Sequence, residues 1–440
     1  MPEPGERAGA EAPTLPAAAR VVRAAREQVE LVPRSLEEAV SADHPARAVW
    51  ALLERLDLAA FYGKVRAVLD GPGRPAADPR VLLGLWVLAT VEGVGSARKL
   101  ARLSREHDAY RWLRGGVPVN YHQLAAFRTG HRAELDGLLS QTVAVLLHQG
   151  LVTLRHVAQD GVRVRASAGA GSFRRRASLE RCLDQARARV DQLAAEAEHP
   201  DPTVGRREAA ARERAAKERA ARVEAAVAEL PALEASKERQ RKKLARGRRE
   251  RVAEARVSTT DPEARVMKMA DGGFRPAYNV QVATDRDGRA IVGVEVTNRG
   301  SDGGLAAPLE EQVAERCGRR PNAYLVDGGL ATRDDVTALE RRGVTVYAPT
   351  EAPRVDGGRA ATDPRPDDTP EVAAWRARMG TDEAKATYRE RGSTAEWTNA
   401  QARTRHGLRQ FAVRGLERVT AAVLLLALTH NLLRWWAVQP

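Results

Sequence analysis

The sequence has few of the residues that build zinc sites and disulfide frameworks. Only two of its 440 residues are cysteine, Cys182 and Cys317, and their separation fits no metal-binding spacing. The nine histidines are scattered, with no His-x-x-x-His pair, which argues against a zinc site. So little cysteine is typical of a reducing compartment, and we expect the protein to work in the cytoplasm.

Long apolar runs are also missing. No stretch of about 18 apolar residues occurs, and the N-terminal segment does not resemble a secretory signal. The most apolar stretch, Val419–Leu428, is too short for a membrane span and continues into polar residues, so we expect a buried helix. Residues 1–34 are rich in Ala, Pro, Glu and Arg, which predicts a disordered tail.

Positive charge, by contrast, is in surplus. The chain carries 71 Lys and Arg against 58 Asp and Glu, a formal net charge of +13. This surplus indicates a polyanionic partner, with nucleic acid as the first expectation and an anionic membrane surface as the weaker alternative. The length is enough for two or three domains.

Residues 35–151 are expected to form a helical domain. Helix-capping residues precede successive apolar stretches of helical period, at Ser35 with Glu38, at Asp78 before Pro79, at Ser96 and at Asn120. Short helices with basic outer positions and glycine-rich turns fit a helix-turn-helix-like module for DNA binding and dimerisation. A helical bundle with a solvated charged face is the alternative.

The period changes to that of a strand over Leu154–Val164, where Asp160 falls on the mainly apolar face. A buried carboxylate is costly without a counter-charge or a metal ion, so Asp160 is a candidate functional residue. The alternative is that Asp160 and Gly161 form a turn that ends the strand.

Residues 172–256 are rich in Ala, Arg, Glu and Lys and predict a basic helical insertion after this strand. We expect His199–Pro202 and Pro231 to interrupt its helices. Nine Lys and Arg against two Glu lie in Lys237–Arg251, a run that can follow a phosphate backbone. Its candidate DNA contacts are Lys237, Arg241, Lys242, Lys243, Arg248 and Arg249. The alternative is a solvated helical hairpin with i,i+4 ion pairs.

Further strands are expected at 277–284 and 290–297, joined as a hairpin, at 323–327, ending on Asp327, and at 344–348. Helices are expected at 304–317 and from Gly392 onward, with Ser393 as cap, whereas 351–379 reads as a loop. This order predicts an α/β fold, a mixed sheet flanked by helices.

Two strand-associated carboxylates, Asp160 and Asp327, can converge with Glu396 from the last helix. Three carboxylates suit Mg²⁺ or Mn²⁺ and a two-metal phosphoryl transfer. Glu396 and Arg403 are seven positions apart and share a helix face. Glu390 competes as third acid, but it lies about 240° from Glu396 on a continuous helix. A capping box on a surface helix is the alternative for Glu396.

Several segments also carry a family resemblance: Asp160–Gly169, Tyr278–Gln281, Val326–Gly329 and Tyr388–Arg403. From about residue 35 to 436 the chain resembles bacterial insertion-sequence transposases of the DDE type, and most of all the insertion sequence group eleven eighty-two. The resemblance implies a ribonuclease-H-like catalytic domain over 152–436. It also implies that Asp160, Asp327 and Glu396, in this order, are the catalytic and metal-binding acids.

The last segment is similar to the Tyr-Arg-Glu-Lys signature of related transposases. Tyr388, Arg391 and Glu396 match it, and Arg403 stands in place of the lysine. The gap from Arg391 to Glu396 is one residue longer than in the commonest pattern. The resemblance implies that Tyr388, Arg391 and Arg403 contact DNA.

The function that the resemblance implies is DNA transposition. The protein would bind the terminal inverted repeats of its mobile element as a homodimer, cleave the DNA ends and join the 3′-hydroxyl to target DNA. Two alternatives remain at this point, a metal-dependent nuclease that does not join strands and a decayed, non-catalytic DNA-binding protein.

Overall fold

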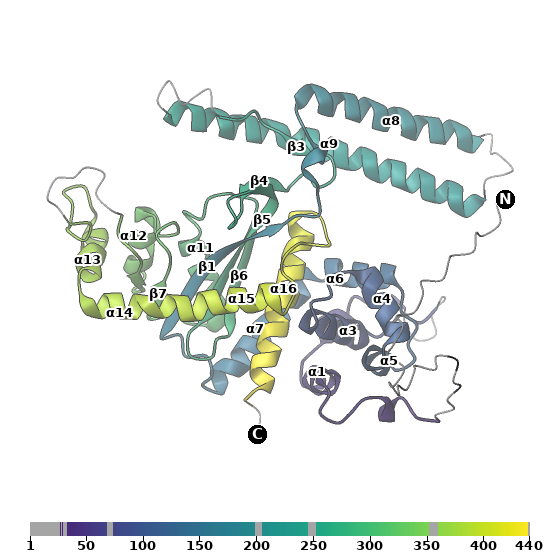
Figure 1. Ribbon diagram of the computed structural model, residues 1–440, viewed down its shortest axis with the longest axis horizontal. Helices are drawn as coiled ribbons and strands as arrows, with labels where there is room; N and C mark the ends of the chain where they lie inside the picture. The colour runs from purple at the N-terminus through teal and green to yellow at the C-terminus, as the bar shows by residue number, and fades with distance from the viewer. Residues whose placement is uncertain are drawn as a thin grey trace, which may run out of the picture.

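The computed structural model describes Glu27, Val29 and residues 33–67, 74–198, 205–244, 252–351 and 360–438. A mixed sheet lies at the centre, a block of short helices packs at one end, and a long helical hairpin projects from the opposite side (Figure 1). Nearly all of the predicted tail, residues 1–34, lies outside the described residues.

The N-terminal block consists of helices, and its caps form as the sequence predicts. The Asp78 side chain accepts a hydrogen bond from the Arg80 backbone, Ser96 caps the next long helix, and Asn120 forms a capping box with Gln123. The elements are η1 (Glu37–Ala39), α1 (Pro45–Glu54), α2 (Ala59–Tyr62), α3 (Pro79–Val91), α4 (Ala97–Glu106), α5 (Asp108–Arg114), α6 (Tyr121–Gly130) and α7 (Arg132–His148).

The central sheet has six strands in the order β4-β5-β1-β7-β8, and β6 also pairs with β5. The strands are β1 (His156–Arg165), β4 (Arg265–Lys268), β5 (Phe274–Asp285), β6 (Ile291–Thr297), β7 (Ala323–Leu325) and β8 (Thr345–Tyr347). β5 runs antiparallel to β1 and β6, whereas β1, β7 and β8 are parallel. Because β1 continues to Arg165, Asp160 lies within a strand, and the alternative of an Asp-Gly turn is wrong.

Helices follow the sheet strands, and one of them lies in a segment that we expected to be a loop. They are α11 (Ala306–Cys317), α12 (Arg333–Arg341), α13 (Pro370–Met379), α14 (Asp382–Arg391) and α15 (Trp397–Thr404). The prediction of a loop over 351–379 is wrong for its last part, α13. Thr369 caps α13, Pro370 occupies its first turn, and Val372, Trp375 and Met379 are buried.

The prediction that a new helix begins at Gly392 is also wrong. A π-helical turn, η3 (Gly392–Glu396), joins α14 directly to α15, so the three form one continuous helix. Ser393 does not cap a helix, since its hydroxyl donates a hydrogen bond to the Glu390 carbonyl at 2.9 Å. In Figure 1 this long helix crosses in front of the sheet.

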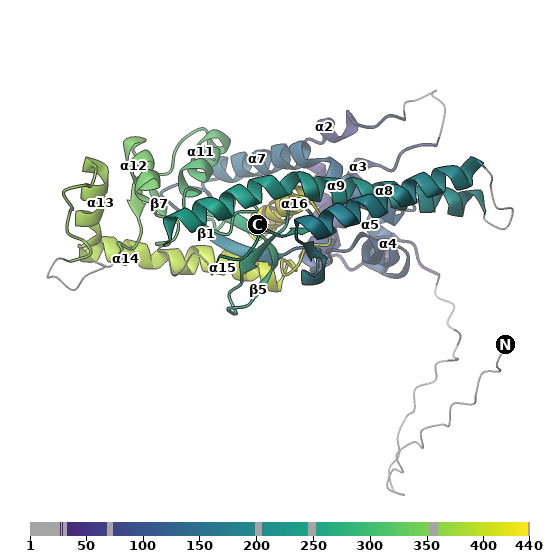
Figure 2. The same ribbon diagram turned by 90° about the horizontal axis from the view of Figure 1, so that it is seen from above.

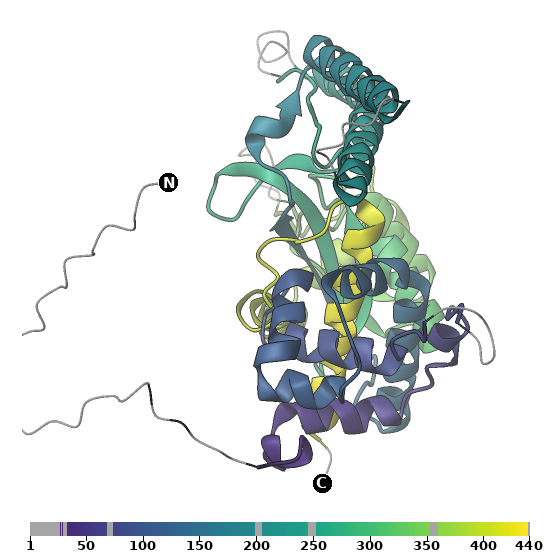
Figure 3. The same ribbon diagram turned by 90° about the vertical axis from the view of Figure 1, so that its right-hand side faces the viewer.

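The insertion is a helical hairpin of α8 (Arg176–Glu198) and α9 (Arg206–Lys243), seen end-on in Figure 3. α9 runs through Pro231, so the interruption predicted there is wrong. The neighbouring Leu230 packs with Leu179 and Val257, and this packing holds the helix together where proline removes a hydrogen bond. At the base of the hairpin two further short strands, β2 (Phe173–Arg174) and β3 (Val257–Ser258), pair with each other. The 3₁₀ turn η2 (Ala170–Ser172) directly precedes β2.

The surface of this hairpin carries the i,i+4 ion pairs that the alternative prediction describes, for example Glu208–Arg212 and Glu213–Lys217. Figures 1 and 2 show the hairpin lying along one side of the sheet, where Arg265 of β4 pairs with Glu229 of α9. The last turns of α9 carry the first part of the basic run, Lys237–Lys243. Arg248 and Arg249 of that run lie outside the described residues.

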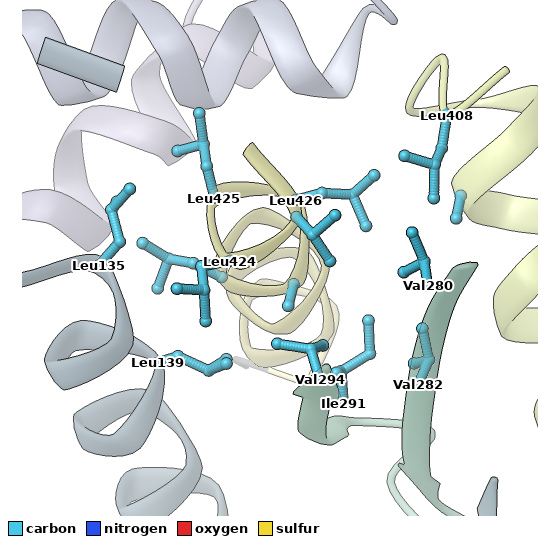
Figure 4. Packing of buried hydrophobic residues seen from close by; sticks show 14 of the residues in the cluster. Leu135, Leu139, Val280, Val282, Ile291, Val294, Leu408, Leu424, Leu425 and Leu426 are labelled. Atoms are coloured by element: carbon cyan, nitrogen blue, oxygen red, sulfur yellow. The ribbon is translucent and has the colours of Figure 1, made fainter. Parts of the chain in front are cut away.

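The last helix, α16 (Leu416–Trp436), joins the sheet to the N-terminal block. Leu424, Leu425 and Leu426 lie between the leucines of α7 and the valines of β5 and β6 (Figure 4). By length and composition α16 could span a membrane, but 72% of its most apolar window is buried inside the protein. It is therefore the central core helix, as its sequence predicts, and one core extends from α1 to the sheet.

Burial of His430 in α16 makes stability depend on pH. The side chain is 3% exposed, its Nε2 lies 2.8 Å from the Arg289 carbonyl, and desolvation lowers its pKa from 6.5 to about 4. The unfolded chain binds this proton near its ordinary pKa, so the folded state loses stability as the pH falls from about 6.5 to about 4. The expected loss from His430 is about 3 kcal/mol.

Urea unfolding across this pH range measures the effect. His430→Gln, which keeps a donor for the Arg289 carbonyl, should make the acid-induced loss of stability smaller by this amount. The remaining slope comes from His406, whose pKa burial also lowers, and from carboxylates. Equal slopes for the two proteins would contradict the assignment to His430.

Candidate active site

Asp160 and Asp327 come to the same level of two adjacent parallel strands. The register pairs His156 with Ala323 and Ala158 with Leu325, and two residues further along each chain are Asp160 and Asp327. Ala158 and Leu325 pack with Ala395 of the π turn η3, so this face of the sheet is covered by the long helix that carries Glu396. The sheet and one helix thus bring together segments that are far apart in the sequence.

Asp160 is largely withdrawn from solvent and has two partners on this helix. Asn399 donates a hydrogen bond from Nδ2 to its Oδ2 at 2.8 Å, and Arg391 Nη1 lies 3.5 Å from its Oδ1. Burial raises the pKa of Asp160, Arg391 and the Asn399 hydrogen bond oppose that rise, and the nearby charge of Asp327 adds to it. Additional positive charge beside Asp160 would therefore stabilise its ionised form.

Asp327 lies in the turn that follows β7. Its Oδ1 accepts a hydrogen bond from the Leu330 backbone at 2.9 Å, which fixes the direction of the carboxylate. Its electrostatic effect reaches both Asp160 and Arg391. This is the strand end on which the sequence places it.

The π turn η3 decides where Glu396 lies. Arg391 and Glu396 are five residues apart, which in a regular α-helix separates two side chains by about 140°. A π turn closes after five residues, so the two stand one turn apart, and Arg391 Nη2 lies 3.8 Å from Glu396 Oε1. The extra residue in the gap between Arg391 and Glu396 is thereby absorbed. Arg391 also lies over the Tyr388 ring, 6.0 Å from its centroid.

Glu390, the competing acid, has partners elsewhere. Its Oε2 lies 3.0 Å from His156 Nδ1, and its Oε1 lies 3.0 Å from Arg286 Nη2. These contacts hold Glu390 at the start of β1, four residues before Asp160. Glu390 and Glu396 thus have different partners, as expected for two residues on different faces of the helix.

Arg391 lies between Asp160 and Glu396. Within the part of the chain that the structure describes, no three His, Cys, Asp or Glu side chains converge closely enough to hold an ion as they are placed. Glu396 is 66% exposed, so its side chain is free to turn toward the other two acids. Arg391 Nη1 is buried without a hydrogen-bond partner. One guanidinium pairs with two carboxylates and feels the charge of the third, Asp327, so the site has more negative than positive charge and several oxygen donors.

The other predicted DNA contacts do not gather at this site. Arg403 is two turns beyond Glu396 and lines a separate basic pocket. Lys237, Arg241, Lys242 and Lys243 lie at the end of α9, which belongs to the projecting hairpin.

A buried polar network behind Asp160 was not predicted from the sequence. Gln159, on the opposite face of β1, accepts from the Tyr324 hydroxyl and donates to Gln281, both at 2.9 Å. Gln281 and Asn279 each donate to Asp302 Oδ1, at 2.8 and 2.7 Å. The Tyr278–Gln281 segment therefore supports the strand that carries Asp160. The sequence does carry a signal for this network: polar residues occupy alternate positions of a strand that has no face toward water.

This network leaves no space beside Gly161. A Cβ atom there would lie 2.4 Å from Gln281 Nε2 and 2.9 Å from Asp302 Oδ1, whereas a Cβ at Gly169 would meet nothing within 4 Å. We expect Gly161→Ala to destabilise the fold by about 1–3 kcal/mol, because the network must shift or break. Denaturant unfolding measures this, with Gly169→Ala as the matched control. Equal stability of the two variants would show that the network tolerates the methyl group.

Two family models match the chain. Residues 360–436 match the model described as Transposase DDE domain, and residues 34–130 match the one described as Transposase domain (DUF772). The first match covers α13 to α16 with Arg391 and Glu396, and the second covers η1 to α6. No match was found among curated proteins or among solved structures. Both family matches support an insertion-sequence transposase of the DDE type.

Proposed function

We propose that this protein is a DDE transposase that binds the terminal inverted repeats of its own element, cleaves the DNA ends and transfers them to target DNA. The observation that supports this most directly is that Asp160 in β1 and Asp327, just after the parallel strand β7, lie at the same level beneath a helix that presents Glu396. The family match over Arg391 and Glu396 supports the same assignment. The proposed catalytic acids are Asp160, Asp327 and Glu396.

The catalytic core is proposed to be ribonuclease-H-like and to span residues 152–436, with 172–256 as its insertion. Its support is the strand order, in which an antiparallel hairpin flanks one side of β1 and two parallel strands flank the other. We assign the chain to the insertion sequence group eleven eighty-two on the sequence segments named above.

The residues present fit a pair of Mg²⁺ or Mn²⁺ ions. The donors are carboxylate oxygens, the ligands these cations prefer. Burial, and to a smaller extent the charge of Asp327, raise the pKa of Asp160, so a bound cation would favour its ionised form. Asp160, Asp327 and Glu396 would hold the metal. When bound, it would activate the attacking oxygen and stabilise the leaving oxygen of an in-line displacement at phosphorus.

The chain's own residues prepare this site. Asn399 fixes the orientation of the Asp160 carboxylate, and the Leu330 backbone does the same for Asp327. The Arg391 charge opposes the rise that burial causes in the pKa of Asp160, and its Nη1, which makes no hydrogen bond, would be available to a phosphate oxygen. The Arg391 guanidinium lies against the Tyr388 ring, 6.0 Å from the ring centroid.

DNA is proposed to contact several surfaces, because a charge of +13 favours a polyanion. The helical domain of residues 35–151 and the end of α9 would hold the duplex, and Tyr388, Arg391 and Arg403 would contact the strand being cut. Two DNA ends must meet for transposition, so a homodimer is proposed, acting in the cytoplasm at the nucleoid.

The test uses a labelled duplex that carries the DNA flanking the gene. With Mg²⁺, purified protein should cleave it at the element end, and a pre-cleaved end should become joined to plasmid DNA. Cleavage without joining would identify the nuclease alternative. Binding without cleavage in either Mg²⁺ or Mn²⁺ would identify a non-catalytic DNA-binding protein and overturn the proposal.

A further inference from the structure

A pocket of about 300 Å³ lies beyond the proposed active site, and its wall is mostly arginine. Five arginines and one aspartate line it, together with the apolar residues Met269, Ala270 and Leu408, which we call its apolar floor. Its charged residues are Arg163, Arg165, Arg275, Arg403, Arg409 and Asp271. A cavity of this size is at the lower end of small-ligand sites, large enough for part of a nucleotide chain.

The charges of this pocket are only partly balanced. Arg163 pairs with Asp302 at 2.6 Å, and Arg275 pairs with Asp271 at 2.7 Å. Arg165, Arg403 and Arg409 make no ion pair with any of the residues that the structure describes. By contrast, Arg320 and Arg342, which also lie together, both pair with Glu310.

Three segments build the pocket, and backbone hydrogen bonds hold two of them together. The Arg165 backbone, at the end of β1, donates to the Arg409 carbonyl at 3.4 Å and accepts from the Phe411 N–H at 2.9 Å. The third wall is the turn between β4 and β5. The arginines are therefore presented by ordered backbone, and Leu408 beneath them is buried.

The pocket is in line with the proposed active site. Arg403 follows Glu396 by seven residues of regular helix, a rise of about 10 Å. In a B-form duplex that rise corresponds to about three base pairs along the helix axis. A strand with its reacting phosphate at the three acids can thus reach the pocket with a neighbouring phosphate.

We propose that this arginine pocket binds the phosphodiester backbone of the DNA strand held in the active site, a few nucleotides from the reacting phosphate. Arg165, Arg403 and Arg409 contact the phosphate oxygens, and the apolar floor lies against the sugars. The inference rests on the proposed function for the identity of the ligand. The bound strand belongs either to the element end or to target DNA, which present the same chemistry.

The test compares two charge-matched double variants. Arg165→Gln with Arg409→Gln removes two charges from the pocket, and Arg333→Gln with Arg341→Gln removes two from α12, on a different part of the protein. Binding is measured without metal by fluorescence anisotropy over a range of salt concentrations, with a duplex of the flanking end sequence. Strand transfer of a pre-cleaved end into plasmid DNA is measured with Mg²⁺. Thermal melting checks that both variants fold.

If the pocket holds the element end, the slope of log Kobs against log salt should become less steep by about 2 for the pocket variant only. If it holds target DNA, end binding should be unchanged and strand transfer should fall at least about tenfold, again for the pocket variant only. Pocket and control variants that behave alike in both assays would overturn the proposal. A pocket-dependent salt slope in a protein that never cleaves DNA would uphold the pocket and reject the transposase.

Discussion

Asp160→Asn, Asp327→Asn and Glu396→Gln are each expected to lower Mg²⁺-dependent cleavage by about 10³-fold or more. Each change removes one negative charge from a site where Arg391 pairs with Asp160 and Glu396 and is influenced by the charge of Asp327. Loss of a group that places charge against the transition state costs about this much. Gel-based cleavage of the flanking end duplex measures the rate, and anisotropy measures DNA binding, which should persist.

Glu390→Gln is the matched control for Glu396→Gln. It removes a carboxylate from the same helix, but one that is held by His156 and Arg286 at the start of β1. Cleavage by the control should stay within about tenfold of the unmodified protein, since the acids keep their places. Undiminished cleavage by any variant of the three acids would remove that residue from the proposed active site. A larger loss in Glu390→Gln than in Glu396→Gln would reverse the assignment of the third acid.

Deleting a single residue at two places in the long helix is expected to give opposite results. Deletion of Ser393 removes one residue from the π turn, which contains one residue more than a turn of α-helix. Arg391 and Glu396 then remain one turn apart, and α14 and α15 keep their packing. Cleavage should stay within about tenfold of the unmodified protein.

Deletion of Ala400 shortens a regular part of the helix instead. Every residue after it turns by about 100°, which takes Ala402, now 4% exposed, out of the core and Arg403 out of the arginine pocket. Cleavage should fall by about 10²-fold or more, since displaced positioning groups have effects of this size. Similar losses for the two deletions, with melting temperatures equal to that of the full chain, would show that the π turn does not set the position of Glu396.

Much of the fold follows from local patterns. Alternation of apolar residues located β1 and the β5–β6 hairpin, and capping residues located α3, α4 and α6. The failures occurred where local rules meet tertiary packing. Pro231 reads as a helix break, yet Leu230 beside it is buried in the base of the hairpin. Ser393 reads as a cap, yet the helix passes through it.

The sequence by itself determined the residue types of the site, three carboxylates with nearby arginines, and the surplus of positive charge. It also determined that Asp160 lies on an apolar strand face, because alternation is a local property. Tertiary structure alone decided that Asp160 and Asp327 share a level, since strand register depends on pairing between distant segments. It also decided that Glu390 turns away and that a π turn brings Glu396 over Arg391, because helix geometry there is set by what the helix packs against.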